Sequence, residues 1–147
     1  IDKLSEEGLP ITLSISLHAP TDTVRASMMP VTRKWPVGEV VAAAARYAKR
    51  TGRKVYFEYT MVAGVNDSRE QAELLAVLLR KILCHVNLIP LNPVRGKENI
   101  ASDRKRIYAF SDTLAKNGVT STVRRRLGTD IDAACGQLRR RRMTENS

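Results

Sequence analysis

The residue with the most distinctive chemistry is Cys135, one of two cysteines in the chain. It lies in the stretch 128–138, where two small residues precede it and a glycine follows it. Arginine runs at 124–126 and 139–142 flank that stretch. Nearby positive charge favours the thiolate, so these surroundings suit a reactive, exposed cysteine. A small, half-buried and inert cysteine fits the same residues equally well, and the rest of the chain has to decide between the two.

Polar residues at two predicted strand ends are the next candidates for chemistry. Ser16 and His18 fall on the polar side of the first strand, within the Ser-Leu-His-Ala-Pro sequence at 16–20. Asn92 follows the third strand, directly before a proline. All three side chains can hydrogen-bond a polar ligand. The spacing alone favours a plainer hypothesis, in which His18 only supports its neighbours and Asn92 caps its own loop.

Three other residues could suggest a charged or metal site. Glu58 lies in the middle of the second strand, where a carboxylate needs a partner. Cys84 and His85 are adjacent, but consecutive strand residues point to opposite faces, which favours packing for Cys84. Because no metal-ligand spacing such as C-x-x-C is present, we predict no metal ligands in this chain.

The composition indicates a globular chain with a polyanionic partner. Its 147 residues are 43% hydrophobic and carry 25 Lys and Arg against 15 Asp and Glu, a net charge of +10. Nucleic acid is the first candidate partner and an anionic membrane surface the second. The membrane hypothesis is weak because no apolar run reaches about 18 residues. The cysteine content and the missing signal sequence predict a cytoplasmic location, and the start at Ile1 suggests that the chain begins inside a longer protein.

Strand and helix patterns alternate along the chain. The expected strands are 11–17, 55–62, 85–90 and 119–125, where apolar residues alternate or cluster. The expected helices are the tail of a helix at 1–7, one at 36–51, one beginning at Asp67 or Ser68, and one capped by Ser102 and ended by Gly118. The expected buried faces of the last three helices are, in order, Val40, Val41, Ala44, Ala45 and Ala48; Leu74, Leu75, Leu78, Leu79 and Ile82; and Ile107, Phe110 and Leu114. The stretch 64–67 is expected to be a turn. The stretches 21–30 and 91–99 are expected to be connections. Residues 139–147 are expected to form a disordered basic tail after one domain at 1–138.

This alternation predicts an α/β fold with a parallel sheet and outer helices. The first three strands each have a polar side. In a sheet covered by helices on both faces, the central strands would be apolar on both sides. A barrel or partial barrel, with one face of the sheet turned to a wet or ligand-filled interior, explains the pattern better. A closed eight-stranded barrel takes about 250 residues, so we predict the C-terminal half of a partial barrel.

Several sequences in the chain, taken together, resemble one family. They are Ser-Leu-His-Ala-Pro at 16–20, Phe-Glu-Tyr at 57–59, Gly-Val-Asn-Asp at 64–67, Cys-His-Val-Asn-Leu-Ile-Pro at 84–90, Asn-Pro at 92–93, and Asp-Ile-Asp-Ala-Ala-Cys-Gly-Gln-Leu at 130–138. In this order they resemble the RlmN/Cfr family of radical S-adenosylmethionine RNA methyltransferases. The resemblance runs from about Gly8 to Leu138.

The resemblance implies a partial (β/α)6 barrel that holds a [4Fe-4S] cluster and S-adenosylmethionine. It implies that Ser16, Leu17, His18 and Asn92 contact S-adenosylmethionine. It also implies that Cys135 is methylated, that a 5′-deoxyadenosyl radical takes hydrogen from this methyl group, and that the resulting radical adds to an adenine of RNA. An adenine carbon is a poor nucleophile, which is why such a step needs a cofactor radical.

The same resemblance implies large RNA partners. Arg124, Arg125 and Arg126 suit contacts with the RNA backbone, and the target adenine must leave its stack. The implied substrate is 23S rRNA, with tRNA as a second candidate, and the implied position of methylation is adenine C2. The implied electron donor is a protein such as flavodoxin, and the full-length protein is expected to be a monomer.

The family's C-x-x-x-C-x-x-C cluster motif, its Gly-Glu motif, its second catalytic cysteine and its general-base glutamate are absent from the 147 residues. In the family these lie upstream, so we expect a C-terminal part that is inactive alone. A Cfr-type enzyme acting at adenine C8 stays an alternative, as does a non-catalytic basic RNA-binding fragment.

Overall fold

Strands and helices alternate along the chain as the sequence predicts. The computed structural model describes residues 1–91 and 100–124. In chain order the elements are α1 (Asp2–Glu6), β1 (Leu13–Ser16), α2 (Asp22–Met28), the 3-10 helix η1 (Pro30–Arg33), α3 (Val37–Thr51), β2 (Val55–Met61), α4 (Arg69–Leu79), β3 (Cys84–Pro90), α5 (Arg104–Lys116) and β4 (Ser121–Val123). The predicted α/β alternation is confirmed.

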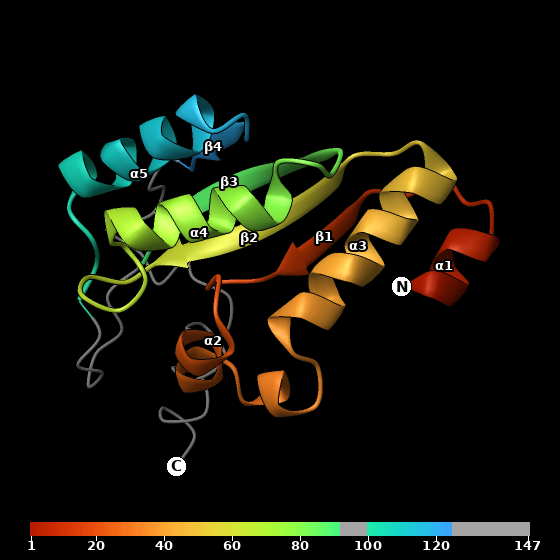
Figure 1. Cartoon of the computed structure of the whole chain (residues 1–147), viewed down its shortest axis with the longest axis horizontal. Coiled ribbons are helices and arrows are strands. Elements are labelled where there is room, and N and C mark those ends of the chain that lie inside the picture. Colours follow the sequence, from red (N-terminus) through yellow and green to blue (C-terminus); the bar gives the residue numbers. More distant parts are fainter. Residues whose placement is uncertain (92–99, 125–147) are drawn as a thin grey trace, which may run out of the picture.

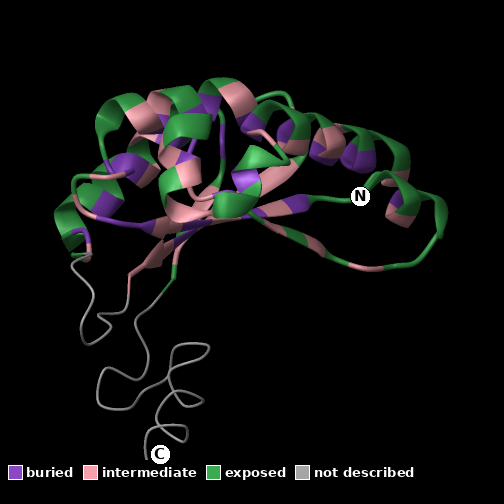
Figure 2. Cartoon of the chain, turned by 90° about the horizontal axis from the view of Figure 1, so that it is seen from below, coloured by how far each residue is buried: buried purple, intermediate pink, exposed green. Residues whose placement is uncertain are grey.

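The described strands form one parallel sheet in the order β1-β2-β3-β4 (Figure 1). Helices α3, α4 and α5 lie over one face of it, and within residues 1–91 and 100–124 no helix covers the other face (Figure 2). Because all strands run in the same direction, their carboxyl ends share one edge. The pairing places Ser16, Glu58, Asn87 and Thr122 in one row across the face that lacks helices. The predicted polar face is therefore confirmed.

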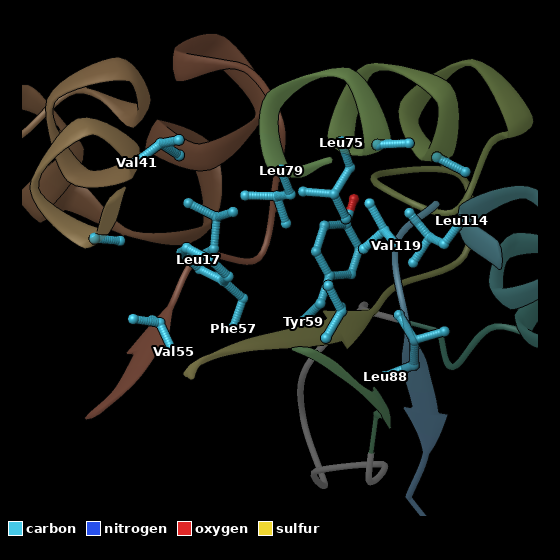
Figure 3. Close-up of a cluster of buried hydrophobic side chains, with 14 of the residues drawn as sticks. Leu17, Val41, Val55, Phe57, Tyr59, Leu75, Leu79, Leu88, Leu114 and Val119 are labelled. Atoms are coloured by element: carbon cyan, nitrogen blue, oxygen red, sulfur yellow. The ribbon is translucent and has the colours of Figure 1, made fainter. Parts of the chain in front are cut away.

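One apolar core fills the space between the sheet and its helices (Figure 3). Phe57 and Tyr59 from β2 are fully buried in it, against Leu75 of α4 and Phe110 of α5. The Tyr59 and Phe110 ring centroids are 5.1 Å apart. Truncating a buried aromatic of this kind to alanine typically costs about 3–5 kcal/mol. Burial raises the pKa of the Tyr59 hydroxyl, which donates at 2.8 Å to the carbonyl oxygen of Asn66.

Two of the predicted helix boundaries are confirmed by their caps. α3 ends at Gly52, whose φ of 66° is the left-handed conformation that glycine adopts without strain. α4 begins with a capping box, in which the Ser68 side chain accepts from the N–H of Gln71 and the Gln71 side chain accepts from the N–H of Ser68. The cap of α5 is Asp103 rather than the predicted Ser102, which is buried and donates to Asp67 instead.

The stretch 21–30 is not the connection that the sequence suggests. It contains helix α2, which Thr21 caps by accepting from the N–H of Val24. Asp22, in the first turn, accepts at 2.6 Å from the N–H of Val37 and so ties α2 to the start of α3. The helix lacks a broad apolar stripe, and polar bonds hold it in place. For that reason hydrophobic periodicity could not reveal it.

The buried face of α4 also differs in part from the prediction. Leu75 and Leu79 are buried as expected, but Leu74 is 48% exposed. Ala72 and Ala76 complete the buried stripe instead, because their small side chains let the helix lie close to the sheet. None of the helices in the described ranges has the length and apolarity needed to cross a membrane.

The free edge of β1 is lined by exposed apolar groups. Among the described strands β1 pairs only with β2, which leaves its other edge without a strand. A hollow of about 680 Å³ lies beside it, lined in part by Ile15, Val31, Trp35 and Val40. Trp35 is 50% exposed and Val31 47% exposed. Such an edge is a ready pairing site for another strand.

Candidate ligand site at the carboxyl edge of the sheet

Ser16, Leu17 and His18 stand together at the carboxyl end of β1. Ser16 is exposed on the face that lacks helices, and His18 is half-buried. Leu17 is fully buried in the core. Its N–H donates to the carbonyl oxygen of Glu58 and its own carbonyl accepts from Arg25. Of the three, Ser16 and His18 thus have side chains available near the strand end, and Leu17 holds its neighbours in place.

Arg25 is a residue of this edge that sequence reasoning missed. Arg25 is only 3% exposed. Its guanidinium group donates to the carbonyl oxygens of Ser16 at 3.2 Å and Leu17 at 3.0 Å. It also donates to the Thr32 hydroxyl and the Trp35 carbonyl. Burial lowers the pKa of Arg25 and the nearby Asp22 opposes this, and the guanidinium group stays charged. Its only sequence signal was that it is the one charged side chain of a stretch expected to be a connection, apart from Asp22.

Asn66 is the second missed residue. Its Nδ2 donates to the carbonyl oxygens of His18 at 2.7 Å and Thr60 at 2.6 Å, while its Oδ1 accepts from the N–H of Val62. The side chain is fully buried and completes the backbone bonding where β1 and β2 end. The Gly-Val-Asn-Asp sequence was expected only to form a turn. A buried asparagine of this kind has no signal in hydrophobic periodicity.

Asp67 links the same turn to α5. Its carboxylate, only 1% exposed, accepts from the N–H of Gly64 and from the hydroxyl of Ser102, and it pairs with Arg106. The short antiparallel bridge between Val62 and Ala101 runs alongside. This junction sets where the chain leaves the carboxyl end of β2 and where α5 begins.

Glu58 is paired, as its mid-strand position required. Its Oε1 accepts from the Asn87 amide at 2.9 Å and from the Ser14 hydroxyl at 3.4 Å. A hollow of about 250 Å³ lies over Glu58, Asn87, Thr122 and Arg124. The carboxylate therefore belongs to a polar network on the face of the sheet that lacks helices.

Arg124 follows β4 and lies near two hollows at this edge. Its N–H donates to the carbonyl oxygen of Leu88, and its side chain is exposed. Besides the hollow over Glu58, it lines one of about 780 Å³ together with Arg104 and Tyr108 of α5. The exposed guanidinium can reach a negatively charged ligand, in line with the backbone contacts expected of it.

Cys84 and His85 lie on opposite faces, as predicted. Cys84 packs against the core, and burial raises the pKa of its thiol to about 11. Such a thiol is inert at neutral pH. The two ring nitrogens of His85 lie 2.9 Å from the Thr120 hydroxyl and 2.7 Å from the Thr122 hydroxyl. In the described part of the chain no group of His, Cys, Asp and Glu residues could hold a metal ion.

Four of the predicted site residues lie outside the described residues. They are Asn92, Arg125, Arg126 and Cys135. The predicted tail at 139–147 and its boundary with the domain lie outside them as well. The structure thus brings Ser16 and His18 together at the strand end and places Arg124 at the same edge of the sheet.

Comparisons with known proteins agree with this geometry. No family model matches the chain. It is 54% identical over 140 residues to a protein of Symbiobacterium thermophilum named "Probable dual-specificity RNA methyltransferase RlmN", covering 95% of the chain and 38% of that protein. It is 47% identical to a protein of the same name from Desulforamulus reducens, covering 99% of the chain and 42% of the relative. The chain spans about two fifths of the length of these curated relatives.

Comparison with solved structures supports the same α/β fold. A crystal structure of a radical SAM methyltransferase from Sphaerobacter thermophilus matches with a TM-score of 0.88 and 49% identity, over 92% of this chain and 40% of that one. A domain of a pyruvate-formate lyase-activating enzyme from Bacteroides vulgatus matches with a TM-score of 0.67 at 18% identity, which bears on the fold alone.

These findings define the chain as part of a radical SAM enzyme fold, a partial barrel of parallel strands with outer helices. Within that class it belongs to the RlmN/Cfr family over the part that it spans. Both the predicted fold class and the predicted family are confirmed.

Proposed function

We propose that this chain is the S-adenosylmethionine-binding and RNA-contacting part of a radical SAM methyltransferase that modifies carbon 2 of an adenine in 23S rRNA, and also in tRNA. The observation that carries the proposal is its 44–54% identity to proteins named as RlmN RNA methyltransferases, over 95–100% of its length. The words "dual-specificity" in their names support two RNA substrates for this chain as well.

The described residues fit S-adenosylmethionine. An exposed hydroxyl on Ser16 and a half-buried imidazole on His18 lie at the carboxyl edge, where ligands of such barrels bind. Asn92 is proposed as a further contact, and Leu17 as the residue that holds Ser16 and His18 in place. When bound beside a [4Fe-4S] cluster, S-adenosylmethionine supplies a methyl group and a hydrogen-abstracting radical. The cluster would take its ligands from outside the described residues.

The proposed carrier of the methyl group is the thiol of Cys135. Cys84, the other cysteine, is excluded from this role by its place in the core and by its raised pKa. This leaves Cys135 as the cysteine whose sequence surroundings suit a reactive thiol. It follows that only one of the two cysteines should be essential.

The proposed RNA contacts are Arg124, Arg125 and Arg126, supported by the net charge of +10. Arg124 is exposed at the same edge as Ser16 and His18. An RNA backbone held there would bring a flipped-out adenine toward the strand ends. A cytoplasmic location, an electron donor such as flavodoxin and a monomeric full-length protein stay predictions.

The test is a methylation assay with the complete protein of the source organism, reconstituted with its cluster. Mass spectrometry of nucleosides from 23S rRNA and tRNA should find adenine methylated at C2. Cys135→Ala should abolish this product, while the matched Cys84→Ala should keep it. Methylation at C8 would replace the proposal with the Cfr-type activity. RNA binding without any methylation would favour the non-catalytic RNA-binding fragment.

A further inference from the structure

The backbone turns directly after β1, at Leu17 and His18 of the candidate site. The N–H groups of Leu17 and His18 both donate to one carbonyl oxygen, that of Glu58, at 3.1 and 3.3 Å. His18 has a φ of 63°, a left-handed conformation that a residue with a side chain rarely adopts. Such a conformation persists only where surrounding contacts fix it, and it is frequent at ligand sites. The contacts that hold His18 in this conformation therefore indicate the function of the turn.

The imidazole of His18 accepts a backbone hydrogen bond from β2, a role that a carbonyl oxygen of the neighbouring strand has in a regular sheet. The N–H of Thr60, in β2, donates to its Nδ1 at 3.0 Å. A backbone amide can only donate, so Nδ1 has to be the unprotonated acceptor nitrogen. In the neutral ring the proton then sits on Nε2. Among the described residues Nε2 has no hydrogen-bond partner, which leaves one N–H available for a ligand.

The electrostatic surroundings keep this ring neutral. Burial and the nearby Arg25 both lower the pKa of His18, and Glu58 opposes them. At neutral pH the ring therefore carries a single proton. Since Nδ1 is engaged by Thr60, that proton is on Nε2, the nitrogen without a hydrogen-bond partner in the ranges 1–91 and 100–124.

Two buried side chains from different parts of the chain, Arg25 in α2 and Asn66 after β2, hold the turn. Arg25 donates to the carbonyl oxygens of Ser16 and Leu17, the two residues before His18. Asn66 donates to the carbonyl oxygen of His18 and to that of Thr60, the residue whose N–H fixes the ring. Backbone and ring orientation are thus fixed together, and neither Arg25 nor Asn66 is exposed enough to meet a ligand.

We propose that His18 presents its Nε2–H as a hydrogen-bond donor to an acceptor atom, an oxygen or a ring nitrogen, of a nucleoside-type ligand, and that Arg25 and Asn66 are the positioning residues that hold it there. The part concerning the ligand rests on the proposed function. The part concerning the ring and its two positioning residues rests on the protein alone.

The first experiment needs no ligand. The chain has two histidines, so long-range 1H–15N NMR of a sample labelled in histidine gives two ring patterns, and His18→Asn assigns them. We expect His18 to be neutral at pH 7 with its proton on Nε2. A proton on Nδ1, a charged ring or an averaged mixture of tautomers would overturn the proposal.

Variants of the positioning residues separate orientation from stability. Arg25→Lys keeps the charge but cannot span two carbonyls, and Asn66→Asp keeps the acceptor for Val62 but loses both donors. Each should shift His18 to a mixture of tautomers. Thr32→Val is the matched control, because it removes one bond to Arg25 and leaves both carbonyl contacts. An unchanged ring pattern in either variant that still folds would refute its positioning role.

The ligand is tested by calorimetric binding of S-adenosylmethionine to the complete protein. His18→Gln carries an amide N–H near the position of Nε2 and should bind within about threefold of the wild type. His18→Asn keeps an acceptor near Nδ1 but has no such N–H, and should bind about tenfold more weakly, as expected for one lost hydrogen bond. Equal binding by both variants would refute the donor role. No binding by the wild type would refute the proposed function while the NMR result stands.

Discussion

Replacing Asp67 by alanine should destabilise the chain more than any other single polar substitution at the junction between β2 and α5. The carboxylate is 1% exposed, yet it accepts at 2.9 Å from the N–H of Gly64 and at 2.8 Å from the hydroxyl of Ser102. Arg106 lies 3.2 Å away and is about half exposed. Asp67→Ala removes the acceptor from all three groups at once.

The magnitude follows from what each partner can do without Asp67. Ser102 is 4% exposed, so its hydroxyl loses a charged acceptor without gaining water, and each such bond is worth about 1.5–3 kcal/mol. The N–H of Gly64 loses a bond of the same kind. The half-exposed side chain of Arg106 can be solvated by water instead, so the loss of its ion pair contributes only about 0–1 kcal/mol to the destabilisation. Because the surrounding structure can relax in part, we expect Asp67→Ala to lower the free energy of unfolding by about 3 kcal/mol.

The assay is urea unfolding followed by circular dichroism, with the free energy of unfolding extrapolated to water. Asp67→Asn is the first control, because it keeps the size of the side chain and an acceptor for the N–H of Gly64. Its free energy of unfolding should fall less than that of Asp67→Ala. Arg106→Ala is the second, and it should lose less than about 1 kcal/mol. If Asp67→Ala costs no more than Arg106→Ala, buried bonding does not hold this junction and the reasoning fails.

Three further predictions concern the whole chain. The edge of β1 that pairs with no described strand should make the chain only marginally stable and prone to self-association. Sedimentation velocity should then show a size that grows with concentration, and Trp35→Ser should reduce this self-association. A tight monomer with cooperative unfolding would contradict this. Binding to 23S rRNA should weaken steeply with salt, with a log–log slope that reflects several phosphate contacts, and a flat response would remove the electrostatic argument. Because burial raises the pKa of Cys84 to about 11, its neutral thiol stabilises the fold fully below about pH 9, and this contribution is lost as the pH rises to about 11. Urea midpoints should fall across that window, and Cys84→Ala should flatten the fall.

The sequence predicted the sheet well because its strands follow simple physical rules. Val55, Phe57 and Tyr59 alternate with polar residues, and one face is indeed buried while the other is not. The polar positions correctly indicated a face that no helix of the described part of the chain covers. Periodicity of this kind reports on burial, which is why it located the strands and the buried sides of α3 and α5.

The supports of the candidate site could not be predicted in the same way. Arg25 and Asn66 are polar residues in stretches expected to be connections, and each is buried only because the chain folds back on it. The groups of the candidate site to which they donate are backbone carbonyls, which have no signature in sequence. Ser16 and His18 were found because they sit on a strand with a clear pattern, whereas the groups that orient them depend on tertiary structure.

The parallel arrangement of the strands separates the chain into two ends with different tolerance for change. The turns 52–54 and 117–120 lead into the amino ends of β2 and β4, opposite the edge that carries His18 and Arg124. Arg53 and Lys54 are exposed, and Gly52 adopts the left-handed conformation that ends α3. A fluorescent label or an inserted affinity peptide at this turn would therefore lie away from the residues proposed to contact S-adenosylmethionine and RNA.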